Sequence, residues 1–191
     1  MHYRLFLLFI LAVSVLSLFA SPSQAQRRDF VTEPESELIR EFQEIDFRIE
    51  ALTKFIDRRL AAAGIPGHTW VLPKKNAELW GEEPKGTKLE LLYDIKRLLQ
   101  KSIDDIDDIA SRTSNAIEEN NTGGKLFPKA VRNLATAAAR YKPIFQAELE
   151  KTKADKERGL LLDSIEFCNQ ITEAAANLPP EIKEEKKKKK T

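Results

Sequence analysis

The sequence predicts an all-α protein, specifically an antiparallel bundle of three to four long amphipathic helices preceded by a cleaved signal peptide. Apolar residues recur at helical spacing through most of the chain. Strand-like alternation is missing, and the 191 residues include only seven glycines. Capping-box patterns precede the first two apolar repeats. Long amphipathic helices joined by turns must bury their apolar faces against one another, which favours a bundle.

Residues 1–25 have the pattern of a secretory signal peptide. A short basic start with Arg4 precedes the uncharged run Leu5–Ala20, and Ser23-Gln24-Ala25 places small residues where cleavage is expected after Ala25. The run is shorter than the roughly 20 apolar residues of a membrane-spanning helix, so an uncleaved N-terminal membrane anchor is the alternative. We therefore predict an exported protein, either periplasmic or extracellular.

The remaining chain has the size of one domain, predicted over residues 26–180. Of the 31 Lys and Arg residues only Arg4 precedes Gln26, which leaves 30 basic residues against 30 acidic ones. Such a near-neutral chain is not expected to bind nucleic acid through bulk charge. Cys168 is the only cysteine, so no internal disulfide can form. It falls on an apolar helix face, where we expect a buried, inert thiol.

The first helix is predicted over about 33–63. Thr32 and Glu35 form a capping box, and Gly64 followed by Pro66 is a typical helix end. Between these two ends, apolar residues recur at alternating steps of four and three, which gives one apolar seam along the helix. The seam contains Leu38, Phe42, Ile45, Ile49, Leu52 and Ile56, and is widened by Phe47, Phe55 and Leu60.

Three further helices are predicted over about 87–121, 128–157 and 159–177. Thr87 and Glu90 form the second capping box, and the third helix is expected to kink near Pro143. The alternative is that the third helix ends at Pro143 and one long final helix follows.

The connection over 64–86 is longer than the 2–8 residues usual between bundle helices. It contains His68, which we expect to be a solvent-exposed loop histidine, and both tryptophans, Trp70 and Trp80. A short helix is predicted over 73–80. One interpretation of the two tryptophans is a site of partner or ligand contact, since Trp is common in interface hot spots. The favoured interpretation is a packed cap over the end of the bundle core.

Two charged clusters complete the pattern. Asp104–Asp108 contains four aspartates that could face a hard cation, but we favour a solvated face paired with bases such as Arg132 and Arg140 on a neighbouring helix. Residues 181–191 are predicted to form a disordered tail, in which Lys186–Lys190 could make weak contact with anionic envelope surfaces.

The sequence shows no catalytic motif, cofactor fingerprint or metal-ligand pattern. We therefore predict an exported, non-enzymatic helical-bundle protein that acts through contacts with another protein, with itself or with the envelope, and that needs no cofactor. The alternative is a metal- or small-ligand-binding helical bundle in the periplasm.

Overall fold

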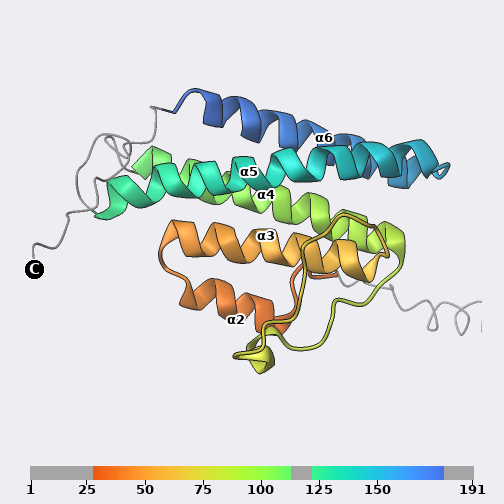
Figure 1. Cartoon of the computed structure of the whole chain (residues 1–191), viewed down its shortest axis with the longest axis horizontal. Coiled ribbons are helices and arrows are strands. Elements are labelled where there is room, and N and C mark those ends of the chain that lie inside the picture. Colours follow the sequence, from red (N-terminus) through yellow and green to blue (C-terminus); the bar gives the residue numbers. More distant parts are fainter. Residues whose placement is uncertain (1–27, 113–121, 179–191) are drawn as a thin grey trace, which may run out of the picture.

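The computed structural model describes residues 28–112 and 122–178. The regular elements of these residues are all helices, with no strand among them (Figure 1), which confirms the all-α prediction. The elements are α2 (Glu33–Glu41), α3 (Ile45–Ala62), the single 3-10 turn η1 (Ala77–Trp80), α4 (Lys88–Arg112), α5 (Thr122–Lys151) and α6 (Asp155–Ala176). The predicted signal peptide with its cleavage site after Ala25, and the predicted tail over 181–191, lie outside the described residues.

The four long helices pack side by side and alternate in direction along the chain (Figure 1). α3 packs on α4 and α5, while α6 packs on α5 and α4. The buried core lies between them, and many of its aliphatic and aromatic side chains have no surface exposed to solvent. The residues with no exposed surface include Ile49, Leu52, Phe55, Ile56, Ile95, Leu99, Ala138, Phe145, Leu161 and Cys168. Burial of the Cys168 thiol is thus confirmed, and burial raises its pKa to about 12.

The prediction of one continuous helix over 33–63 is wrong, because a turn at 42–44 divides this segment into α2 and α3. Phe42 leaves the helical conformation (φ −80°, ψ 89°) while its N–H still donates to the Leu38 carbonyl. The Arg48 Nε then donates to the Phe42 carbonyl oxygen at 3.0 Å, which satisfies the group that the turn exposes. The turn folds α2 back along α3 (Figure 1).

The seam largely survives this turn, because its apolar spacing continues across it. Leu38, Ile45 and Ile49 are buried on either side, and Phe42 is half-buried. Phe47 was expected to widen the seam, but it is 47 % exposed and carries the Lys129 ammonium 5.7 Å from its ring centroid. A regular seam therefore does not guarantee one continuous helix.

The second capping box is confirmed. Glu90 donates its N–H to the Thr87 hydroxyl at 3.3 Å, and the Thr87 N–H donates to the Glu90 carboxylate at 2.6 Å. The described part of this helix ends at Arg112, and the remaining predicted residues to 121 lie outside the described ranges.

The last two helices break at neither of the predicted places. α5 begins at Thr122 and continues through Pro143 to Lys151, and α6 already begins at Asp155. Pro143 is tolerated because it is exposed, so the carbonyl one turn earlier can be hydrated. The break lies at 152–154, where Arg158 Nη1 donates to the Leu149 and Thr152 carbonyls, each at 2.9 Å. These bonds satisfy carbonyls that the end of a helix leaves free.

Candidate functional site

The connection between α3 and α4 is an ordered structure. It begins with a tight turn at Gly64 (φ 67°), after which the Ile65 N–H donates to the Leu60 carbonyl at 2.9 Å. Asp57 of α3 then holds its first part, accepting from the Thr69 N–H at 3.2 Å and from the Thr69 hydroxyl at 2.8 Å. The same carboxylate accepts hydrogen bonds from Nη1 and Nη2 of Arg140 on α5, each at 2.8 Å. A bidentate, charge-assisted pair of this kind fixes geometry strongly.

The two tryptophans come together against α3. Trp80 is 8 % exposed and packs edge-on to Phe55, with ring centroids 5.8 Å apart. Trp70 lies on Trp80 at 5.0 Å between centroids. The Arg58 guanidinium carbon lies 5.2 Å from the Trp70 centroid and 5.9 Å from that of Trp80, within cation–π range of both. The rings therefore cover the flank of α3 rather than the end of the core, which corrects the predicted location of the cap.

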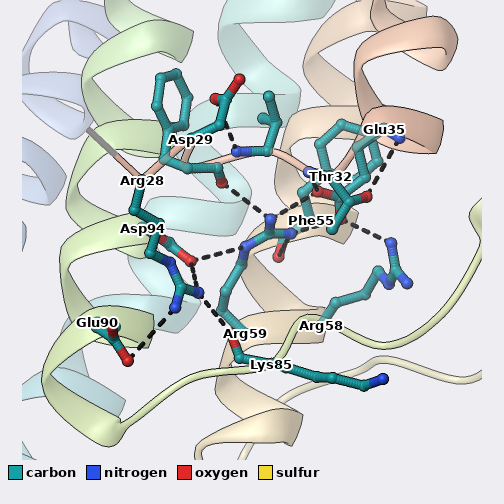
Figure 2. Close-up of polar contacts among 12 residues, drawn as sticks. Arg28, Asp29, Thr32, Glu35, Phe55, Arg58, Arg59, Lys85, Glu90 and Asp94 are labelled. Atoms are coloured by element: carbon teal, nitrogen blue, oxygen red, sulfur yellow. Dashed lines mark hydrogen bonds and ion pairs between the residues drawn. The ribbon is translucent and has the colours of Figure 1, made fainter. Parts of the chain in front are cut away.

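Arg58 also belongs to the buried ion cluster, which we define as Arg28, Glu35, Arg58, Arg59 and Asp94 (Figure 2). Arg28 is 33 % exposed, and the other four side chains are buried. Glu35 of α2 has no exposed surface and accepts from Arg58 at 2.7 Å and from Arg59 at 2.5 and 2.6 Å. Arg58 also donates to the Glu82 carbonyl at 2.7 Å. Burial lowers the pKa of the Arg58 guanidinium, and the charge of Glu35 opposes that effect.

Arg28 and Asp94 extend the cluster to the segment before α2 and to the end of the connection. Arg28 Nη2 donates to the Asp94 carboxylate at 2.8 Å and to the Lys85 carbonyl at 2.7 Å (Figure 2). Arg59 Nη2 donates to the Phe30 carbonyl at 2.9 Å. Burial raises the pKa of Asp94 to about 6, against the opposing effect of Arg28. The cluster thus holds two segments against α3 and α4. One is the chain around Arg28, and the other is the last part of the connection.

The connection carries exposed aliphatic side chains. Val71 is 78 % exposed, Leu72 52 % and Leu79 43 %, and we call these three residues the loop surface. Other large exposed hydrophobic residues in the described ranges, such as Leu162, lie on the long helices. The loop surface therefore concentrates exposed apolar area on the connection that Asp57 and Arg58 hold in place.

Two concavities adjoin these elements. A groove of about 520 Å³ lies where α4 and α6 begin, and its apolar lining residues include Leu89, Tyr93 and Leu160. Gly159 also lines the groove, and a side chain at that position would meet only open space. A smaller notch of about 220 Å³ lies between α2 and η1.

The other predicted candidates differ in part from expectation. His68 is half-buried rather than solvent-exposed, and its Nδ1 is buried without a hydrogen-bond partner in the described structure. Three of the four aspartates over 104–108 are exposed, as expected for a solvated face. Their pairing differs, because Asp105 and Asp108 pair within α4, with Lys101 at 3.1 Å and Arg112 at 2.9 Å, while Arg140 binds Asp57. Across residues 28–112 and 122–178, no group of three or more His, Cys, Asp or Glu side chains is arranged to hold a metal ion.

Sequence reasoning missed the buried ion cluster, although one signal was present. Arg59 follows Ile56 by three residues and so occupies the next step of the apolar seam. A charged residue at a seam position indicates either the end of the buried face or a buried ion pair. The partner Glu35 could not be identified, because it precedes Arg59 by 24 residues in what reads as the same helix.

The fold and these contacts place the chain among all-α proteins with a bundle-like packing of long helices. No protein-family model, no curated protein and no solved structure matches it. Within the described ranges, every helix is too short or too polar to cross a membrane.

Proposed function

We propose that this chain is an exported, non-enzymatic helical-bundle protein that binds another protein through the loop surface. The exposure of Val71, Leu72 and Leu79 on an anchored connection is the observation that carries the proposal. Concentrated exposed apolar area is typical of interaction sites rather than of ordinary protein surface.

The anchoring of the connection supports the same function. Asp57 holds Thr69 on one side of the exposed residues, and Arg58 holds the Glu82 carbonyl on the other. Trp70 and Trp80, whose rings are in tilted contact, pack between the connection and α3. A surface that is already ordered loses less conformational entropy on binding, which increases affinity for a given contact area.

A photoreactive amino acid at position 72 tests this proposal in the cells from which the protein comes. We expect one specific adduct, absent when the same amino acid replaces Leu162, which is equally exposed at 52 % but lies on α6. The captured protein, once identified and purified, should bind Leu72→Ser roughly tenfold more weakly than wild type, because buried apolar area is lost. Leu162→Ser should leave that affinity unchanged. Identical adducts from both positions, or equal affinities of both variants, would contradict the proposal.

Export is tested separately by the amino terminus of the processed protein. Removal of residues 1–25 would leave Gln26 as the first residue. We expect mass spectrometry of the protein from its native cells to give that terminus. A full-length chain held in the membrane fraction would favour the membrane-anchor alternative instead.

The groove beside Gly159 supports a second candidate, the binding of a small apolar ligand. Its volume of about 520 Å³ and its apolar lining fall within the usual range of ligand sites. Ligands that bind the folded state raise the melting temperature by mass action. We expect such a rise with small amphiphiles, and its loss in Gly159→Leu, which fills the groove. Equal rises in wild type and variant would exclude the groove as the site.

A further inference from the structure

The notch between α2 and η1 combines an apolar floor with an acidic rim. Its lining residues are Pro34, Glu37, Leu38, Glu41, Glu78 and Leu79. Leu38 is 5 % exposed and forms part of the floor, with Pro34 and Leu79 beside it. All three carboxylates are on exposed residues, two from one face of α2 and one from η1. Folding of α2 back along α3 is what creates this notch.

The rim has an excess of negative charge. Glu37 is paired with Arg40, whereas Glu41 and Glu78 have no ion-pair partner among the described residues. An apolar floor beneath free carboxylates suits a lysine side chain, because its methylene groups can cover Leu38 and Leu79 while the ammonium reaches the rim. A hard metal ion fits less well, because no group of three or more carboxylates among the described residues is arranged to hold one.

We propose that the notch is the docking site for Lys186–Lys190 of the same chain. The described structure ends at Leu178, eight residues before this run of five lysines. Eight to twelve extended residues span about 26 to 43 Å. The C-terminal ends of α2 and α6 lie toward the same end of the molecule (Figure 1). The rim and the lysine run therefore carry opposite charge, and a tether that spans the distance between them supplies a local concentration on the order of millimolar.

Docking on the notch has a consequence for the loop surface, because Leu79 belongs to both. A docked lysine segment would cover part of the apolar area proposed for partner contact. The docking itself does not rest on that partner, so the two proposals are tested by different measurements.

Zero-length carbodiimide cross-linking of the processed chain, residues 26–191, tests the docking at low micromolar concentration. We expect isopeptide links from Lys186–Lys190 to Glu37, Glu41 or Glu78 in the monomer fraction. An undocked tail would instead link mainly to Glu166 and Glu173, which are exposed near the C-terminal end of α6. That pattern would overturn the proposal, and so would links to the notch found only in cross-linked dimers.

Matched charge variants make the result specific. The triple variant Glu37→Gln, Glu41→Gln and Glu78→Gln should lower the yield of tail cross-links to the whole chain about fivefold, from the loss of several weak ion pairs. The control triple variant Asp104→Asn, Asp107→Asn and Asp108→Asn makes the same change of net charge on exposed positions of α4. An equal fall in both variants would show that only net charge matters and would overturn the proposal.

Binding to vesicles that contain an anionic phospholipid gives an independent readout. If the notch holds the lysines, the notch variant releases them and should bind these vesicles more tightly than wild type. The α4 control makes the same charge change without releasing the lysines, so the notch variant should also bind more tightly than this control. Equal vesicle binding by the notch variant and the control would mean that the tail is free in the wild-type protein, contrary to the proposal.

Discussion

Helix α3 carries two buried sets of side chains that hold the molecule in different ways. Ile49, Leu52 and Ile56 are apolar and pack into the core shared with α4 and α5. Arg58 and Arg59 are equally inaccessible, yet they meet Glu35 and backbone carbonyls of the connection and of the segment before α2. Apolar packing is non-directional, whereas each buried charge requires a particular partner at a particular distance.

This difference shows why the two sets respond differently to substitution. An apolar set loses stability in proportion to the area and volume removed from it. A buried ion set loses stability when one charge is removed without its partner, because the remaining charge keeps its full desolvation penalty.

Glu35→Ala should have the largest effect. It leaves Arg58 buried without a carboxylate partner and Arg59 with only Asp94, 3.9 Å from its Nε, and we expect the free energy of unfolding to fall by about 3–5 kcal/mol. Urea denaturation of residues 26–191 measures this, with the exposed Glu37→Ala on the same helix as control. The combined variant Glu35→Leu, Arg58→Met and Arg59→Met should recover most of the loss, because it removes the charges together. A loss that persists in the combined variant would contradict the role of charge balance.

Leu52→Ala should have the next largest effect, through a cavity in the apolar core. Leu52 has no exposed surface, so we expect a loss of about 2–4 kcal/mol in the same denaturation experiment. The comparison between the two sets is sharpened by Leu52→Met, which conserves volume and should cost less than about 1.5 kcal/mol. An equal loss of stability in Leu52→Met and Leu52→Ala would show that packing of the core depends on exact side-chain shape and not only on volume.

Asp57→Asn should have an intermediate effect that is concentrated in the connection. It removes the charge that binds Arg140 and weakens the hold on Thr69, at a cost of about 1–3 kcal/mol. Hydrogen exchange should show faster exchange of backbone amides near Thr69, with little change in the core of α6. Uniform acceleration over all helices would indicate that Asp57 supports global stability and has no special relation to the connection.

Near neutral pH the titration of Asp94 should have the smallest effect, because its contribution changes only in acidic solution. Its pKa is raised from 3.8 to about 6, first by burial, so the folded protein keeps a proton between about pH 4 and 6 that the unfolded chain releases. The contribution of Asp94 to the free energy of unfolding therefore falls as pH rises through that interval and stays level above it.

Urea denaturation from pH 4 to 8 checks this, by comparison with Asp94→Asn. The stability of wild type relative to the variant should decrease from about pH 4 to 6 and then stay constant. The exposed Asp163→Asn controls for loss of a carboxylate elsewhere. An increase over the same interval would show that Arg28 and Arg59 outweigh burial at this site.

Much of the helical architecture could be predicted from local patterns. Thr32 and Thr87 mark true helix beginnings, because a cap depends on residues only three positions apart. The end of α5 was missed because it depends on Arg158, which reaches back to carbonyls six and nine residues earlier. Trp70 and Trp80 were identified as notable residues, but their position against Phe55 and Arg58 was not.

Amphipathic helices with caps and a shared apolar core can be predicted from local patterns, since these follow from the spacing of nearby residues. The folded chain alone reveals the turn at 42–44, the contacts of Glu35 with Arg58 and Arg59, and the notch between α2 and η1. These features depend on which distant segments meet. A continuous apolar period is the same whether the helix runs straight or folds back on itself.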